Sequence, residues 1–178
     1  MKDLKKFNIQ FVGLKEGSHL FEYQIDNTFF EAFNFDEYLD SNLNVQINFV
    51  KKPTLLELSF TVNGTINVPC DITNEPFDLI IDGKLPLLIK FGEEYNDDNE
   101  ELIIVAHGSY EINVAQYIYE MIVLAVPTKR VHPKVIDGTL ESEALKRLKQ
   151  LEIKESKTVE KTDPRWDKLK DLLTEKNK

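Results

Sequence analysis

One stretch of the sequence, residues 113–126, limits the fold more than any other part of the chain. Its only polar side chains are those of Asn113, Gln116 and Glu120, which recur at steps of three and four, so a helix here is apolar outside one narrow stripe. Asn113 can cap the first turn with Gln116 as its reciprocal partner, and Pro127 forces the chain out of the helix. The stretch is too short to cross a bilayer. We therefore predict a buried helix that the rest of the domain wraps.

Two segments upstream carry dipeptides, Asn-Gly at 63–64 and Asp-Gly at 82–83, that are typical of tight hairpin turns. Apolar residues nevertheless keep the same parity on both sides of each glycine, whereas a reversal there would send polar side chains into the core. The even-numbered series is Leu56, Leu58, Phe60, Val62, Ile66, Val68, Cys70 and Ile72, and the odd-numbered series is Phe77, Leu79, Ile81, Leu85, Leu87, Ile89 and Phe91. The pattern predicts one long strand through each glycine.

The two long strands are expected to pair through the loop of residues 71–76. If Cys70 lies opposite Phe77, then Gly64 falls opposite Gly83 and the two glycine bends coincide. Coincident bends would curl the sheet strongly, which wrapping a helix requires.

Alternating apolar residues predict further strands. Residues 7–11 and 21–25 are expected to form a hairpin, and 43–49 an antiparallel strand with one polar face. Residues 26–40 are predicted to form a short helix or an aromatic turn, and 102–106 a further buried strand. The fold class that follows is α+β, a strongly curved antiparallel β-sheet with long bent strands wrapped around one buried helix, plus C-terminal helices.

Charge is distributed unevenly along the chain, whose formal net charge is -9. Residues 1–128 hold 8 Lys/Arg and 21 Asp/Glu, a balance of -13, while residues 129–178 hold 14 and 10, a balance of +4. An acidic body repels phosphate backbones, so we expect any RNA contact to lie on the basic tail or its junction with the body.

The same change in composition suggests two parts. We predict a strand-rich domain over residues 1–137 and a basic helical C-terminal extension over 138–178. The extension is expected to contain a helix at about 140–153 and a charged linker at 154–162.

Several classes of protein are disfavoured by what the chain contains. Cys70 is the only cysteine, so no internal disulfide can form, and its parity favours a small core residue over a reactive thiol. The first residues lack an apolar run, which predicts no signal peptide, no membrane association and a cytoplasmic location. The acidic segment 92–101 lacks the spacing of a calcium loop, so we interpret it as a solvated, mobile loop. We find no catalytic set of residues and predict no metal and no cofactor.

Four residues after the helix, Lys129, Arg130, His132 and Lys134, form the most basic cluster next to the body. They are either part of a solvated loop or a contact for phosphate or an acidic partner, since basic clusters gain affinity for nucleic acid by releasing counterions. Aromatic residues that would stack on bases are missing nearby, which argues against sequence-specific reading of single-stranded RNA.

The last segment of the chain has the pattern of a short amphipathic helix. Asp163 can cap it, and Pro164 suits the first helical position. Its apolar stripe consists of Trp166, Leu169, Leu172 and Leu173. The mixed charges around Trp166 differ from those of a basic membrane-surface helix, so we expect docking on protein, either within this chain or on a partner.

Four segments in order resemble one known family. They are the loop at 68–77 (Val-Pro-Cys-Asp-Ile-Thr-Asn-Glu-Pro-Phe), the helix end at 119–127, the segment Lys-Arg-Val-His-Pro at 129–133 and the tail motif Asp-Pro-Arg-Trp-Asp-Lys-Leu at 163–169. Together they resemble the YceD family, a bacterial and plastid family associated with accumulation of large-subunit ribosomal RNA, and the tail resembles the Bacteroidetes-type branch. Many members carry Cys-x-x-Cys in the loop, but Thr73 replaces the second cysteine here. We therefore transfer no metal role to this chain.

The resemblance implies a non-enzymatic ribosome-biogenesis factor that binds a large-subunit rRNA precursor or a ribosomal or assembly protein. The candidate contact residues are Lys129, Arg130, His132, Lys134, Arg165, Trp166 and Leu169. An alternative is a protein-protein adaptor that uses the Trp166 helix and never touches RNA. A nuclease is a third hypothesis, and magnesium-dependent cleavage of precursor RNA by the purified protein would point to it.

Overall fold

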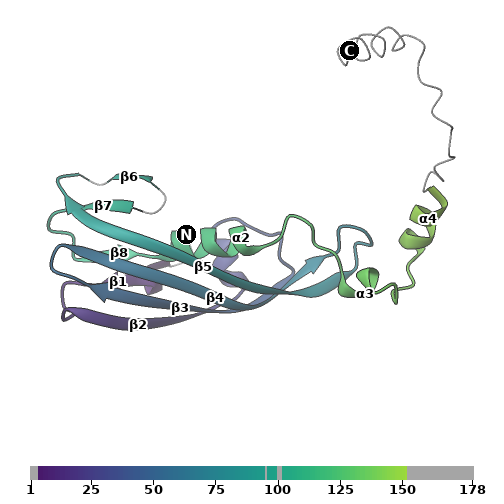
Figure 1. The fold of residues 1–178 in the computed structure, drawn as a ribbon, viewed down its shortest axis with the longest axis horizontal. Helices are drawn as coiled ribbons and strands as arrows, with labels where there is room; N and C mark the ends of the chain where they lie inside the picture. Colours follow the sequence, from purple (N-terminus) through teal and green to yellow (C-terminus); the bar gives the residue numbers. More distant parts are fainter. Residues whose placement is uncertain (1–3, 95, 100–101, 152–178) are drawn as a thin grey trace, which may run out of the picture. The chain divides into compact units, whose positions relative to one another are not determined.

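The computed structural model describes residues 4–94, 96–99 and 102–151. The chain divides into two units, Met1–Leu140 and Glu141–Lys178, and of the second unit only residues 141–151 are described. The elements in chain order are η1 (Leu4–Phe7), β1 (Asn8–Gln10), β2 (Gly17–Ile25), α1 (Asn27–Ala32), β3 (Asp40–Lys51), β4 (Leu55–Pro69), β5 (Pro76–Gly92), β6 (Asn96–Asn99), β7 (Leu102–Ala106), β8 (Glu111–Asn113), α2 (Ala115–Ala125), α3 (Pro133–Ile136) and α4 (Glu143–Leu151) (Figure 1).

The first unit is a mixed α/β fold dominated by one large sheet. Its six strands lie in the order β2-β3-β4-β5-β7-β6, and a separate two-stranded sheet pairs β1 with β8. The expectation of a fully antiparallel sheet is wrong, because β7 pairs with β5 in parallel. Between these two strands in the sequence lies β6, which pairs with β7. The acidic segment therefore contains a strand and is not entirely a loop.

The two long strands run unbroken through their glycines, so this prediction is confirmed. Gly64 has a φ of +144°, and a Cβ there would collide with the backbone oxygen of Asn42 and the Cα of Leu43 in the neighbouring strand. Only glycine fits such a position without strain.

The predicted register between β4 and β5 is wrong by two residues. Val68 lies opposite Phe77 and Val62 opposite Gly83, so the two glycines do not face each other. The cause is the turn, in which Cys70 donates its N–H to Glu75 O at 2.9 Å and already belongs to the loop. A shift of two residues preserves parity, which explains why most residues of the two series lie in the core as predicted, although Ile72 is 38% exposed. The coincident bends and the strong curl that they imply are not found.

The N-terminal residues do not form the predicted hairpin. β1 pairs with β8 and β2 pairs with β3. The turn between β1 and β2 is tied to Lys51, whose Nζ donates to the carbonyls of Phe11 and Leu14 at 2.9 and 2.8 Å. Alternation identifies a strand but not its partner, so this part of the topology was not readable from the pattern.

Helix α2 packs on the sheet with one face. Ala115, Ile118, Met121 and Ile122 are buried. Leu124 is 80% exposed, so the prediction of a wrapped helix that exposes only its narrow polar stripe is wrong. The helix lies close to β5 at Gly83. A Cβ at this position would lie only 3.0 Å from the Cβ of Ala125.

The helix ends also differ in detail from the prediction. Asn113 Oδ1 accepts the N–H of Ala115 at 3.0 Å, although the N-cap position is Val114. Gln116 does not complete a capping box, since its amide donates to Glu120 at 2.7 Å.

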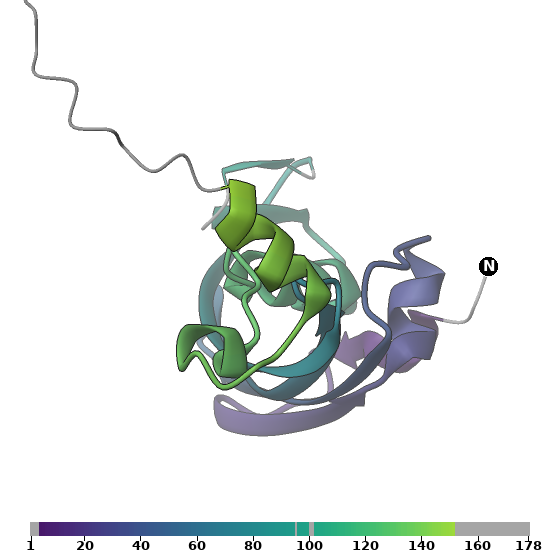
Figure 2. The ribbon, with the colours of Figure 1, turned by 90° about the vertical axis from the view of Figure 1, so that its right-hand side faces the viewer.

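Helices α1 and α2 lie on the same side of the large sheet (Figure 2). Phe33, the C-cap residue of α1, stacks on Tyr119 of α2 with ring centroids 4.5 Å apart. Asp26 caps α1 by accepting the N–H of Thr28, which confirms a short helix within residues 26–40. None of the helices within the described residues is long and apolar enough to cross a membrane.

Beyond the sheet, the helix predicted at 140–153 is confirmed over Glu143–Leu151. The linker at 154–162 and the segment with Arg165, Trp166 and Leu169 lie outside the described residues, so these predictions are not tested. Helix α3 was not predicted.

Candidate functional site: the segment after helix α2

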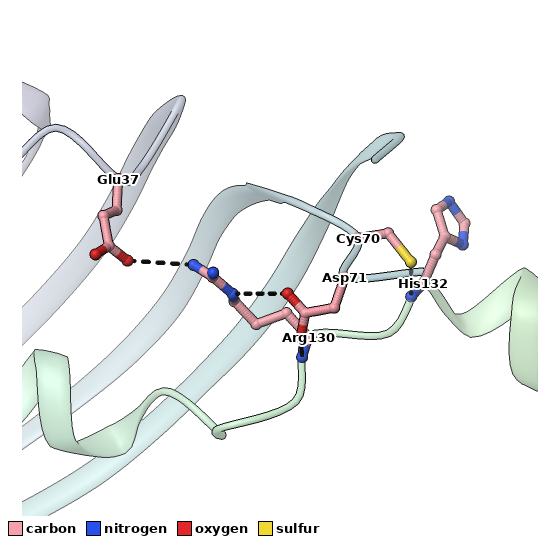
Figure 3. Close-up of polar contacts among 5 residues, drawn as sticks. All are labelled: Glu37, Cys70, Asp71, Arg130 and His132. Atoms are coloured by element: carbon pink, nitrogen blue, oxygen red, sulfur yellow. Dashed lines mark hydrogen bonds and ion pairs between the residues drawn. The ribbon is translucent and has the colours of Figure 1, made fainter. Parts of the chain in front are cut away.

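The basic cluster lies in residues 127–134, which we call the exit segment because it carries the chain away from α2. It runs from Pro127 to the first turn of α3 and passes the β4–β5 turn (Figure 3). Four of the sequence-predicted contact residues belong to it, and they divide into two pairs with different surroundings.

Arg130 is held by acidic residues on both its backbone and its side chain. Its N–H donates to Asp71 Oδ2 at 2.7 Å, and its carbonyl accepts the N–H of Asp71 at 2.8 Å. Its guanidinium lies 3.5 Å from Asp71 Oδ1 and 3.4 Å from Glu37 Oε2 (Figure 3). The side chain is only 25% exposed. Two carboxylates therefore already compensate this charge, which leaves it poorly suited to bind phosphate.

His132 is attached to the same turn. Its N–H donates to the sulfur of Cys70 at 3.3 Å, and its ring lies 5.3 Å from that of Phe77. Its Nδ1 accepts the N–H of Lys134 at 3.0 Å, so the imidazole caps α3. An acceptor role for Nδ1 assigns the ring proton to Nε2. His132 is thus a structural residue that starts a helix.

Cys70 completes this anchor and is 2% exposed, which confirms its prediction as a small core residue. Burial raises the pKa of its thiol, but the hydrogen bonds that the sulfur receives outweigh burial, so the pKa lies below its ordinary value. The donors are the N–H of His132, the Thr73 hydroxyl and the N–H groups of Ile72 and Thr73. The sulfur therefore acts as a hydrogen-bond acceptor that joins the turn to the exit segment.

Lys129 and Lys134 are exposed, unlike the two anchored residues between them. Neither ammonium group forms an ion pair with a residue in the described part of the chain. The backbone between them is nevertheless anchored at Arg130 and His132. Two free cations are thus presented from an ordered segment.

A groove of about 230 Å³ lies beside the exit segment. It is lined by Phe35, Glu37, Tyr38, Val123, Val126, Pro127, Thr128 and Arg130. Burial raises the pKa of Tyr38 to about 12, with smaller contributions from nearby Glu37 and Tyr119, so this phenol stays protonated and can donate a hydrogen bond. No sequence pattern pointed to Glu37 and Asp71, because their importance depends on contacts with Arg130, which lies far along the chain.

The described residues contain no cluster of three or more His, Cys, Asp or Glu side chains that could hold a metal ion. The exit segment combines a hydrogen-bonded backbone at Arg130 and His132 with exposed side chains at Lys129 and Lys134.

The fold defines a mixed α/β protein with one large sheet, and the exit segment carries two exposed lysines. The sequence model of one family, described as large ribosomal RNA subunit accumulation protein YceD, matches residues 58–173. The match covers more than half of the chain, and the chain therefore belongs to the YceD family. It includes most of β4 and all of β5, α2, the exit segment and the tail motif, but it does not distinguish a branch of the family. No curated protein and no solved structure matches the chain.

Proposed function

We propose that this protein is a non-enzymatic, cytoplasmic factor that supports accumulation of large-subunit ribosomal RNA by binding precursor RNA or an assembly protein through Lys129 and Lys134. Membership of a family named for this accumulation supports the general role. The observation that carries the contact surface is the exposure of these two lysines on an exit segment whose backbone is anchored at Arg130 and His132. A fixed backbone reduces the conformational entropy lost on binding.

Charge supports this position for a contact with RNA. Residues 1–128 hold 13 more acidic than basic side chains, whereas the basic excess begins at Lys129. Phosphates are attracted to the junction and repelled by most of the body. Arg165 in the tail motif would extend the same surface, with Trp166 and Leu169 supplying an apolar contact.

The test is crosslinking in cells followed by identification of the attached RNA and protein. The variant Lys129→Glu/Lys134→Glu is compared with Lys15→Glu/Lys90→Glu, a matched control in which two other exposed lysines are reversed. We expect large-subunit precursor or an assembly protein with the wild type and the control, and a strong loss with the first variant. Equal recovery from all three proteins would contradict the proposal.

The adaptor remains a second candidate, favoured by the apolar stripe of Trp166, Leu169, Leu172 and Leu173 in the sequence. It predicts protein partners without RNA and loss of those partners when residues 155–178 are deleted. Unchanged partner capture by the deleted chain would exclude it.

A further inference from the structure

Strand β5 has a neighbour on only one side over most of its length. It pairs with β4 from Pro76 to Lys90, but β7 covers its other edge only from Leu88 to Gly92. Within the described residues, the edge before Leu88 is therefore paired with no other strand.

The register shows which backbone groups point to this open edge. The N–H of Cys70 donates to Glu75 O, and this pair continues the register of β4 and β5 into the turn. Hydrogen-bonded pairs alternate along an antiparallel ladder, so the backbone groups of the odd-numbered residues of β5 bond to β4. On the other edge, Gly92 O accepts the N–H of His107, so even-numbered residues point away from β4. The N–H and C=O groups of Asp78, Ile80, Asp82 and Lys84 consequently face the open edge. Pro86 has no N–H, and it ends this series of donors.

The side chains of the same residues form a charge pattern on the outer face of the sheet. Ile80 is 80% exposed, and Asp78 and Asp82 on either side of it are exposed as well. Asp78 accepts one hydrogen bond, from Asn67 at 2.7 Å, and no ion pair joins either aspartate to a residue in the described ranges. The edge therefore offers free strand-pairing groups beside an Asp-Ile-Asp pattern.

The opposite edge of the sheet, formed by β2, lacks this pattern. Its side chains on the same face are hydrogen-bonded to β3, with Ser18 donating to Asn48, Gln24 donating to Asn42 and Glu22 accepting from Gln46. Leu20 is 64% exposed there but has no pair of aspartates beside it. The two edges thus differ in charge while sharing a sheet.

We propose that the open edge of β5 binds an extended basic segment of a partner protein, which adds to the sheet as a further strand. Alternate side chains of a paired strand lie opposite each other, so lysine or arginine would face Asp78 and Asp82, and an apolar residue would face Ile80. Nucleic acid is disfavoured by the two carboxylates. A second copy is disfavoured because antiparallel pairing centred on Ile80 would set Asp78 opposite Asp82. The inference rests on the proposed function in that the partner is a basic protein of the assembling subunit.

The test uses the full chain and three synthetic peptides. The first has lysine, valine and lysine at alternate positions with threonine between them, so that valine can face Ile80. The second has the same composition in scrambled order, and the third carries glutamate in place of lysine. Binding is measured by fluorescence anisotropy, and the site is mapped by amide chemical shifts. We expect binding of the alternating basic peptide alone, with shifts at residues 78–84.

Two variants and one matched control assign the binding to the β5 edge. Ile80→Pro removes a donor that β4 does not use, and Asp78→Lys/Asp82→Lys reverses the charge, so each should weaken binding about tenfold or more. Leu20→Pro makes the equivalent change on β2 and should leave binding unchanged. Unfolding midpoints of all variants establish that the sheet is intact.

The proposal is overturned if the scrambled peptide binds as well as the alternating one, if the shifts map to β2, or if the edge is occupied by the chain's own tail or a second copy. Failure here is distinguishable from failure of the proposed function, because crosslinking through Lys129 and Lys134 does not depend on Asp78, Ile80 or Asp82.

Discussion

Two pairs of residues in the exit segment differ in their contacts and exposure, although all four lie within six positions. Arg130 and His132 bond to the β4–β5 turn through Asp71 and Cys70, whereas Lys129 and Lys134 remain exposed. The comparison teaches that a basic cluster in a sequence is not a binding site as a whole. The acidic and sulfur acceptors that the fold brings near decide which members keep a free charge.

The largest expected effect on stability comes from removing the aromatic ring that packs against His132. Phe77 is 6% exposed and contacts the ring of His132. Phe77→Ala should lower the free energy of unfolding by about 3 kcal/mol, because a buried aromatic side chain is replaced by a cavity. Urea denaturation measures it, with the exposed Ile80→Ala as a control that should change little. A loss for Phe77→Ala as small as that of the control would contradict the anchor.

The next effect concerns the acidic partner of Arg130. Asp71→Ala removes the acceptor of the Arg130 N–H and one carboxylate beside the guanidinium. We expect a loss of about 1 kcal/mol in unfolding free energy, since charged hydrogen bonds contribute more but this side chain is 38% exposed to screening solvent. Asp36→Ala, at another exposed carboxylate, should be neutral in the same denaturation experiment. If both variants are equally stable, Asp71 does not hold the segment.

The Cys70 anchor predicts a pH dependence. The hydrogen bonds to sulfur lower the thiol pKa in the folded protein below that of the unfolded chain, so the thiolate stabilises the fold. This contribution is fully present above the unfolded-state pKa of about 8.5 and is lost as the pH falls through the lower folded pKa. Stability of the wild type relative to Cys70→Ala should therefore increase from neutral to alkaline pH. Thiolate absorbance of this only cysteine gives the folded pKa directly, and a value above that of a free thiol would refute the account.

The smallest effect on stability belongs to the exposed pair. Lys129→Ala/Lys134→Ala should change unfolding free energy by less than about 0.5 kcal/mol, as expected for surface residues without partners. The same variant should bind precursor RNA or its protein partner more weakly and with a reduced dependence on salt. Strong destabilisation would mean that the lysines belong to the anchor after all.

The sequence allowed the strands to be identified well because side-chain parity is a local property. Continuity through Gly64 and Gly83 and the inward orientation of most of both apolar series followed from alternation alone, although Ile72 is 38% exposed. The register and the pairing of the strands could not be predicted in this way. The register of β4 and β5 depends on the bond between Cys70 and Glu75 in the turn, and β1 pairs with β8, which lies far along the chain. The position of helix α2 in the sequence was predicted closely. The exposure of Leu124 was not, because it depends on which face of the helix the sheet covers.

The candidate site was predicted in position but not in its division into two pairs. Arg130 meets Asp71 and Glu37, which lie 59 and 93 residues away in the sequence. No periodic pattern encodes contacts over such separations, so the free and the bound cations looked alike. The exposed lysines were distinguished only when these acceptors were found.

The central claim is tested most directly by the level of large-subunit ribosomal RNA in cells that lack this protein and receive one of three genes. The account predicts that the wild type and Lys15→Glu/Lys90→Glu restore the RNA, while Lys129→Glu/Lys134→Glu, expressed at the same level, does not. Full restoration by Lys129→Glu/Lys134→Glu would contradict it.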